Sequence, residues 1–206
     1  MDVQFTGSWY DETAEYNAAN ALINGGCKLI SQHADSMGAP NACESAGIPN
    51  VSYNGSTFEA CPDTFIVSSR INWAPYYKYI IAQMAKAEGN DATKANVDKD
   101  WTGTIKTGSV VLTNVGGGAA AEGTVEKIVE VREKLVKGQI HVFDTNTFTV
   151  NGKQLDANYM ADVDTDAAFA PDTIVVENGI FFESKHRSAP YFDVRIDGIT
   201  LLNEKF

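Results

Sequence analysis

Short β-rich runs alternate with helical patterns over the first half of the chain. The first run covers residues 3–6, and a helix is expected over about residues 13–24, where small apolar residues recur at helical spacing. Gly25-Gly26 follows this helix and supplies the left-handed conformation that ends many helices. The residues expected to share its apolar face are Ala14, Ala18, Ala21 and Leu22.

The same order of strand and helix continues along the chain. A second helix is expected over about residues 36–46, while Asn72 and Pro75 are placed to cap and open a third. Strands separated by helices of about 10 to 15 residues form βαβ units with parallel strands. This part of the chain is therefore predicted to be a flavodoxin-like α/β lobe, in which helices cover both faces of a parallel sheet. The further strands are expected at residues 27–31, 48–53, 65–68 and 105–112.

Beyond residue 138 the pattern changes from helical to hairpin-rich. A Gly- and Ala-rich connection leads into a helix expected over about residues 124–137. Asn-Gly or Asp-Gly pairs then lie between β-rich runs, which is a strong local signal for hairpins. We therefore expect an α/β ligand-binding lobe over residues 1–138 and a hairpin-rich antiparallel segment over residues 139–206, in the same or an adjoining lobe. The hairpin pairs are Asn151-Gly152, Asn178-Gly179 and Asp197-Gly198.

The net charge of the chain excludes several classes of partner. The 206 residues carry a formal net charge of −11, with 27 acidic against 16 basic side chains. Such a chain repels phosphate backbones and anionic membrane surfaces, so nucleic acid is not expected as a partner. No apolar run is long enough to span a bilayer. The N-terminus has no signal segment, which leaves cytoplasmic residence or a start inside a longer gene.

The cysteines and the motifs that are missing argue against metal and enzyme chemistry. Cys27, Cys43 and Cys61 form no Cys-x-x-Cys pair and have no His at zinc-finger spacing, so no metal site is expected. Cys43 and Cys61 either pair in an oxidising compartment or stay as small buried thiols. The nucleophile elbow, phosphate loop, dinucleotide fingerprint and zinc-protease motif are all absent from the sequence. We expect no cofactor and no catalysis.

The loops that follow the strands are the candidate binding site, because ligands bind where the strands of an open parallel sheet end. Four such loops cover residues 7–11, 32–36, 53–56 and 70–73, and right-handed crossovers would place them on one rim. The candidate ligand-binding residues on these loops are Trp9, Tyr10, His33, Asp35, Ser36, Tyr53, Asn54, Asn72 and Trp73.

This rim predicts a ligand that is both aromatic and polar. Trp9 and Trp73 offer flat faces to a planar ring, at roughly 1 to 3 kcal/mol per stacked base in comparable nucleic-acid sites. Asn54 and Asp35 match donors and acceptors on ring edges or on sugar hydroxyls. A largely apolar cleft with a few placed polar groups acquires its specificity in this way.

Each candidate also has a structural alternative. Trp9 and Trp73 are compatible with packing roles, and Asn72 and Asp11 are each placed to cap a helix. His33 is compatible with an ordinary hydrogen-bonded structural role. The functional interpretation therefore depends on four loops sharing the same composition.

Several motifs, in order along the chain, carry a family resemblance. They are Gly7-Ser8-Trp9-Tyr10-Asp11, Ile30-Ser31-Gln32-His33-Ala34-Asp35-Ser36, Ile71-Asn72-Trp73-Ala74-Pro75-Tyr76-Tyr77 and Ile140-His141-Val142-Phe143. With their spacing they resemble the successive motifs of the basic-membrane-protein family of ABC-transporter substrate-binding lipoproteins. The resemblance covers about residues 3–155.

The resemblance implies a two-lobed clamshell with the topology of type I periplasmic binding proteins. The chain would then be the C-terminal lobe, the N-terminal lobe would be missing, and half a binding cleft would remain. Trp9 takes the place of the aromatic residue that stacks on the base in the family. Asn54 stands where nucleoside-binding members have an Asp that holds the ribose, and Asn72 where they have a Lys. These departures leave a free base or another heterocycle open as the ligand.

The function implied by the resemblance is capture of a purine nucleoside or nucleobase for an ABC importer. The implied partners are a small purine-like molecule, the ABC permease and the missing lobe. The parent protein would be a lipid-anchored protein outside the cytoplasm. Two alternatives share the fold, namely a ligand-sensing domain of a receptor or transcription regulator and a flavodoxin-like enzyme such as a nucleoside hydrolase. A DNA-binding segment upstream would favour the regulator, and cleavage of a nucleoside would favour the enzyme.

Overall fold

The described chain is built from two compact groups of segments. The structure is a computed structural model that describes residues 1–203. Each unit is discontinuous in sequence, so the chain passes between the units more than once. The domain boundary expected at residue 138 stays a prediction. The first unit contains residues 1–71, 110–131 and the segment from Gly198, and the second contains residues 72–109 and 132–197.

A four-stranded sheet in the order β2-β3-β4-β5 lies at the centre of the first unit. Strands β2, β3 and β4 are parallel neighbours in sequence order, which confirms an α/β fold with a parallel sheet. Strand β5 is antiparallel to β4 and places Val111 opposite Arg70. The strands are β2 (Ile30–Ser31), β3 (Asn50–Tyr53), β4 (Phe65–Ile71) and β5 (Val110–Leu112).

Strand β5 is shorter than the sequence predicted. The residues just before it form a tight turn, in which the Ser109 N–H donates to the Thr104 carbonyl at 3.1 Å and the Thr107 hydroxyl donates to the same oxygen at 3.0 Å. Gly108 completes the turn with a φ of 77°. These bonds use backbone groups that a strand would need for its ladder, so the expectation of a strand from residue 105 is wrong.

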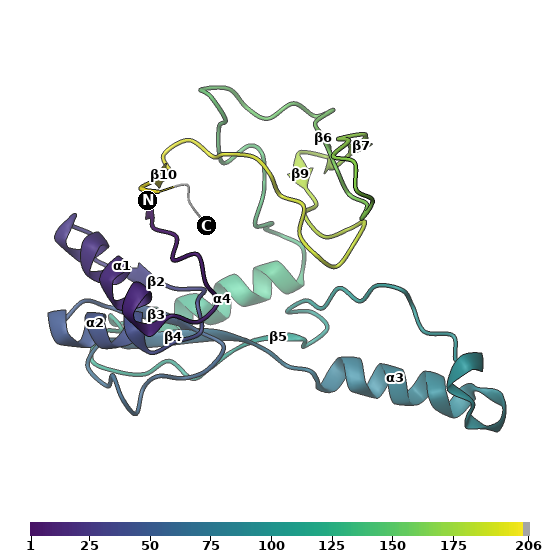
Figure 1. Cartoon of the computed structure of the whole chain (residues 1–206), viewed down its shortest axis with the longest axis horizontal. Coiled ribbons are helices and arrows are strands. Elements are labelled where there is room, and N and C mark those ends of the chain that lie inside the picture. Colours follow the sequence, from purple (N-terminus) through teal and green to yellow (C-terminus); the bar gives the residue numbers. More distant parts are fainter. Residues whose placement is uncertain (204–206) are drawn as a thin grey trace. The chain divides into compact units, whose positions relative to one another are not determined.

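Helices α1 (Glu12–Asn24) and α2 (Gly38–Ala46) lie side by side in the first unit (Figure 1). At their closest approach, a β-carbon on Gly38 would lie 2.3 Å from the Glu12 carbonyl oxygen, so only glycine fits there. Small side chains thus allow the two helices to pack closely and share one core. The buried members of this core are Ala19, Ile30, Ala39, Ala42 and Cys43.

The buried face of α1 is rotated from the face that the sequence predicted. In the structure Glu15 and Ala19 are the buried residues of the helix, whereas Ala21 is exposed. The predicted apolar face is therefore wrong, because the buried positions lie one residue after Ala14 and Ala18. An apolar stripe does not include Glu15, but a carboxylate can be buried where hydrogen-bond donors satisfy it.

The N-terminal run does not join the central sheet. Strand β1 (Asp2–Val3) pairs in parallel with β10 (Thr200–Leu201) and forms a separate two-stranded sheet. The Asn203 side chain extends this pairing, because it accepts from the Phe5 N–H at 2.7 Å and donates to the Phe5 carbonyl at 2.9 Å. The prediction that residues 3–6 form the first strand of the parallel sheet is therefore wrong. The backbone groups of this segment form hydrogen bonds with residues 200–203 instead.

The second unit begins with an exposed helix. Helix α3 (Ala74–Lys86) has no buried residue and leads into two short 3₁₀ turns, η1 (Glu88–Asn90) and η2 (Ala92–Lys94). The Trp101 ring contacts the rings of Tyr76 and Tyr79 at centroid distances of 5.6 and 5.0 Å. Aromatic contacts of this kind hold the returning segment against the helix.

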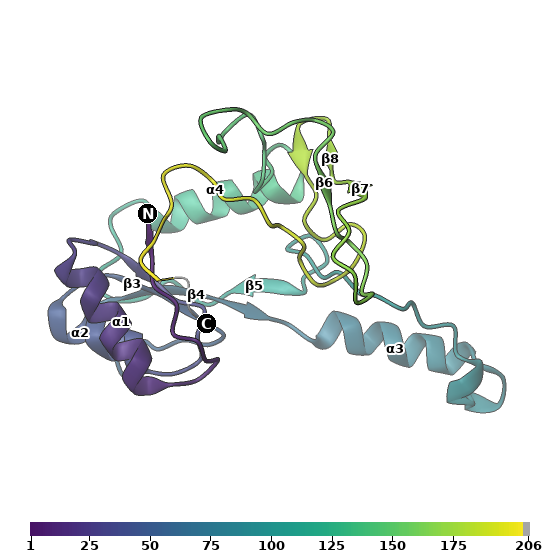
Figure 2. The same cartoon turned by 45° about the horizontal axis from the view of Figure 1, so that its top comes forward.

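The rest of the second unit has an aromatic core. Its short strands pair antiparallel, and their ribbons are labelled in Figure 2. The Phe143 and Phe192 rings are stacked at 4.0 Å, next to the buried Phe181. The Tyr191 side chain is also buried in this core. The strands are β6 (Met160–Ala161), β7 (Thr173–Ile174), β8 (Val176–Glu177) and β9 (Ile180–Phe181).

Two of the three hairpin predictions are confirmed. Asn178-Gly179 joins β8 to β9, and Asn151-Gly152 lies in a turn whose flanking residues 150 and 153 exchange backbone hydrogen bonds. The third prediction is wrong, because the strand after Asp197-Gly198 pairs with β1. The Asp197 carboxylate instead accepts from the Gly152 N–H at 2.8 Å.

The last helix, α4 (Thr124–Val136), contributes residues to both units. None of its described residues is buried. Its surface carries ion pairs such as Lys127–Glu130 at 3.0 Å, which are worth little in solvent. None of the helices within residues 1–203 has the length and apolar character that crossing a membrane requires.

Candidate ligand-binding site

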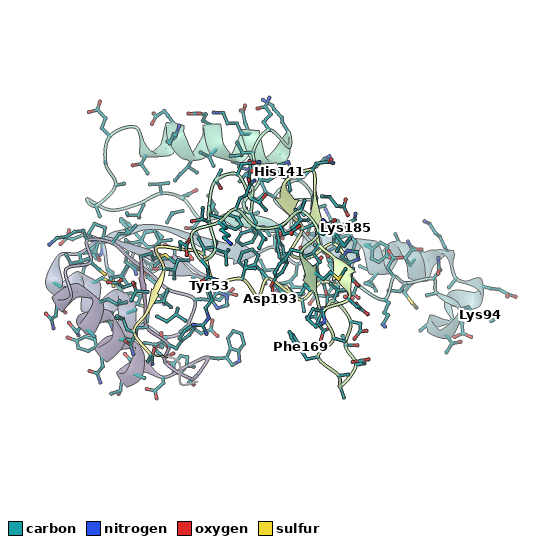
Figure 3. All side chains as sticks on the ribbon, turned by 90° about the horizontal axis from the view of Figure 1, so that it is seen from above. Tyr53, Lys94, His141, Phe169, Lys185 and Asp193 are labelled. Atoms are coloured by element: carbon teal, nitrogen blue, oxygen red, sulfur yellow. The ribbon has the colours of Figure 1, made fainter. Side chains whose placement is uncertain are left out.

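Three aromatic rings from three different loops of the first unit lie in a row. The Trp9 and His33 ring centroids are 5.9 Å apart, and the His33 and Tyr53 centroids are 4.4 Å apart. These loops precede α1, follow β2 and end β3, respectively; Tyr53 is labelled in Figure 3. Trp9 is 72% exposed, so one face of the indole is open to a ligand. We call these three residues the ring row.

The backbone around the ring row is closely tied. The Asp35 N–H donates to the Trp9 carbonyl at 2.9 Å, which links the first loop directly to the second. The Asp11 carboxylate accepts from the Ala14 N–H at 2.9 Å and caps α1. The Asn54 N–H donates to the Ser69 carbonyl at 2.8 Å and joins the third loop to β4. The rings are therefore presented by loops with fixed backbones.

Several polar side chains beside the ring row are available to a ligand. Within the described part of the chain, the side chains of His33, Asp35 and Asn54 make no hydrogen bond with protein groups. Asn54 has a left-handed backbone with a φ of 68°, a conformation that Asn tolerates better than most residues. Tyr10 is exposed as well. The loops of the ring row thus carry donors and acceptors that the described protein groups leave free.

Ser36 differs from these residues, since it is only 3% exposed. Its hydroxyl accepts from the Gly38 N–H at 3.1 Å, and its carbonyl accepts from the Gln32 amide at 3.2 Å. These bonds shape the turn that leads into α2. Contact between Ser36 and a ligand stays a prediction.

The remaining two candidates belong to the second unit. The Asn72 side chain accepts from the Ala74 N–H at 3.2 Å and donates to the Gly108 carbonyl at 2.9 Å, so it is engaged in structural bonds. Trp73 is 55% exposed and lies 6.3 Å from the Tyr77 ring. A single pocket that combines Trp73 with Trp9 stays a prediction.

Two side chains that the sequence analysis did not single out belong to this region. Gln32 donates to the Ala34 and Ser36 carbonyls, while its own side-chain oxygen is buried and has no hydrogen-bond partner among residues 1–203. Glu15 is buried beneath the loops and accepts from the backbone. The one available signal was the position of Glu15 in the first turn of α1, where helix N-termini favour carboxylates.

A concavity of the first unit has a volume of about 600 Å³ and is lined by residues of β4, β5 and the neighbouring loops. Phe58, Phe65 and Val111 give it apolar walls, and Arg70 is its one charged lining residue. Ser56, which the sequence analysis placed with the rim loops, lines this concavity instead.

The cysteines do not form a reactive centre. Burial raises the pKa of Cys43 to about 11, and burial also raises the pKa of Cys61. Both are free, buried thiols, and Cys27 is free and half-buried. In the described part of the chain, no group of three or more His, Cys, Asp or Glu side chains is placed to hold a metal ion.

The sequence and fold together define a family. Residues 1–146 match the family model Bmp, whose description is ABC transporter substrate-binding protein, PnrA-like. This match covers more than half of the chain, which therefore belongs to that family. The resemblance inferred from the motifs is thus confirmed.

Two curated relatives and one solved structure are similar to the chain. A protein of Haloferax volcanii, provisionally named an ABC transporter glucose-binding protein, is 24% identical over 146 residues, 71% of this chain and 35% of its own length. A purine-binding protein of Brucella abortus is 31% identical over 101 residues, 49% of this chain and 25% of its own. The chain thus spans about a third or less of these relatives.

The solved structure is a transcriptional activator of the comK gene from Bacillus halodurans. It aligns with a TM-score of 0.51 at 14% identity, over 67% of this chain and 47% of the other. At this identity the likeness concerns the fold alone.

Proposed function

We propose that this chain is a ligand-contacting part of the solute-binding component of an ABC importer, and that it captures a planar, purine-like heterocycle on the open face of Trp9. The single observation that carries the ligand class is the ring row, in which the exposed Trp9 indole contacts the His33 ring and His33 contacts Tyr53. Membership of the substrate-binding family supports the transport role. The purine-binding relative supports the ligand class.

The geometry favours stacking with polar recognition around it. An exposed indole binds any planar ring through its face, and His33, Asp35 and Asn54 have hydrogen-bonding capacity to spare. The absence of an Asp at position 54 and of a Lys at position 72 favours a free base over a nucleoside. Capture would be non-covalent and without turnover, outside the cytoplasm and next to the permease.

A sugar is the second candidate ligand. It is favoured by the relative that is named as glucose-binding, and tryptophan faces also pack against the apolar face of a pyranose. A sugar would use the same exposed indole, so both ligands place Trp9 at the centre of the site.

Tryptophan fluorescence and thermal unfolding would test the proposal, with millimolar purine bases, purine nucleosides and glucose as the ligand panel. A ligand at ten times its dissociation constant stabilises the fold by about 1.4 kcal/mol, which is a measurable shift in Tm. We expect one purine to shift both signals, and Trp9→Ala to abolish the response.

Trp101→Phe is the matched control, because it removes an indole that packs on α3 in the second unit. This variant should respond to ligand as the parent chain does. A response to glucose alone would show that the ligand is a sugar and not a purine. If no compound shifts either signal, or if Trp9→Ala still responds, capture on Trp9 is refuted.

A further inference from the structure

Glu15 is a buried carboxylate whose hydrogen-bond donors all come from the backbone of the binding loops. It lies on α1 and is 2% exposed. Its carboxylate accepts from the Asp11 N–H at 3.1 Å and from the Ser36 N–H at 3.2 and 3.3 Å. No salt bridge of the described residues involves Glu15. A negative charge held in this way needs both donors in place.

The two donors belong to the two loops that carry the first two rings of the ring row. Asp11 lies two residues after Trp9, and Ser36 lies three residues after His33. The Asp35 N–H also donates to the Trp9 carbonyl at 2.9 Å. The Glu15 carboxylate therefore links the two loops through their N–H groups. The hydrogen bond between Asp35 and Trp9 links the same loops a second time.

The packing beneath the loops leaves little freedom for this arrangement to adjust. A β-carbon on Gly38 would lie 2.9 Å from the Glu15 β-carbon and 2.8 Å from the Tyr16 nitrogen. Helix α2 thus presses against the turn of α1 that carries Glu15. This close packing of the two helices supports one position of the carboxylate relative to both loops.

We propose that Glu15 is a positioning residue of the binding site, whose buried carboxylate sets the spacing between Trp9 and His33. Its effect on affinity rests on the proposed function, but its effect on the ring spacing does not. A carboxylate suits this position because its Oε1 accepts from the Asp11 N–H, while the Ser36 N–H is shared between Oε1 and Oε2. An amide at this position offers one acceptor oxygen and points an NH₂ group toward a donor.

Glu15→Gln tests this role, with Glu12→Gln as the matched control. Glu12 is an exposed residue in the same first turn, so both variants remove one negative charge from one helix end. The readout is the set of indole N–H cross-peaks in a ¹H–¹⁵N spectrum of the ligand-free chain, one for each of the three tryptophans. The Trp9 cross-peak is assigned by its loss in Trp9→Phe.

We expect Glu15→Gln to move the Trp9 cross-peak, because the ring current of His33 changes with the ring spacing, and to leave those of Trp73 and Trp101 in place. Glu12→Gln should move none of them. If Glu15→Gln lowers Tm but leaves the Trp9 cross-peak unmoved, Glu15 is only a structural residue. Equal movement in both variants would also overturn the proposal.

A measurement on the parent chain covers the case in which Glu15→Gln does not fold. The buried Ser36 N–H donates to the Glu15 carboxylate, so we expect slow hydrogen exchange at this amide. Fast exchange at Ser36 would contradict the proposal without any variant.

Measuring the dissociation constant of a purine distinguishes a failure of the role proposed for Glu15 from a failure of the proposed function. For a purine that binds the parent chain, Glu15→Gln should weaken the dissociation constant by about tenfold, and Glu12→Gln should leave it unchanged. An unchanged dissociation constant would overturn the role of Glu15 in binding. If no purine binds the parent chain, the proposed function fails, while the Trp9 cross-peak still decides the role of Glu15.

Discussion

Helices α1 and α3 are each thirteen residues long and both are amphipathic, but they differ in what they bury. Helix α1 buries Glu15 and Ala19 against α2 and β2, whereas α3 buries no residue at all. On α3, Tyr77 is 58% exposed and Ile81 is 66% exposed. The helix that follows the Trp9 loop is thus the one that packs against another helix.

The different burial of α1 and α3 shows that an apolar stripe favours a helix but does not determine which element packs against it. The half-buried positions of α3 recur at helical spacing and include Tyr76, Ile80 and Met84. Helix α1 gains its burial from the small residues of α2, which let the two backbones approach closely. Local periodicity is a property of a segment, and burial is a property of the rest of the chain.

The largest expected difference between the two helical regions is in thiol reactivity. Ile81→Cys would place a thiol with an ordinary pKa on the exposed side of α3, whereas Cys43 on α2 has a pKa of about 11. At pH 8 the smaller thiolate fraction alone makes Cys43 react about 200-fold more slowly with a maleimide. Because its pKa is raised, the rate at Cys43 should climb about tenfold per pH unit up to pH 10.

Peptide mass mapping after timed labelling would measure each cysteine separately. In denaturant both thiols should react at the same rate, which serves as the control. Equal rates in the folded chain would remove the contrast between α2 and α3.

The next largest effect is expected at the contact between α1 and α2. Gly38→Ala should lower the free energy of unfolding by about 2 to 3 kcal/mol, because the added carbon would meet backbone atoms of α1 at less than 3 Å. Gly55→Ala is the matched control, since a β-carbon on Gly55 would have no atom within 4 Å. The control should stay within about 0.5 kcal/mol of the parent chain in urea unfolding. A similar loss in both variants would contradict the close packing of the two helices.

The smallest expected effects compare one alanine on each helix. Ala19→Leu should cost about 1 to 3 kcal/mol, because Ala19 is buried against α2 and the larger side chain must displace its neighbours. Ala85→Leu on the exposed side of α3 should change the stability by less than about 0.5 kcal/mol. Both values come from the shift in the midpoint of urea unfolding. If Ala85→Leu were as costly as Ala19→Leu, α3 would be packed in solution and the comparison would fail.

Much of the fold could be predicted from the sequence. The helices at 12–24 and 38–46 and the parallel strands that follow them are close to their predicted places, because capping residues, glycines and apolar spacing are local signals. The hairpins at Asn151-Gly152 and Asn178-Gly179 were predictable for the same reason, since the pair itself sets the turn. The motifs also identified the family.

The candidate site was predictable only in part. Trp9, His33 and Tyr53 were named from their loops, and the structure brings their rings together. Glu15 was not named, because its role depends on a donor that is 21 residues away in sequence. Pattern arguments place a lone carboxylate in solvent unless a partner is known.

The sequence by itself determined the helices, two of the three predicted hairpin turns, the parallel βαβ pattern of β2, β3 and β4, and the family, since each depends mainly on signals that are local along the chain. Tertiary structure alone decided that β1 pairs with β10, that α1 buries Glu15 and that α3 stays exposed. These outcomes depend on which distant backbone groups and side chains are left unsatisfied. The pairing of buried hydrogen-bonding groups and the close packing of side chains depend on contacts across the whole chain, so a local sequence pattern cannot predict them.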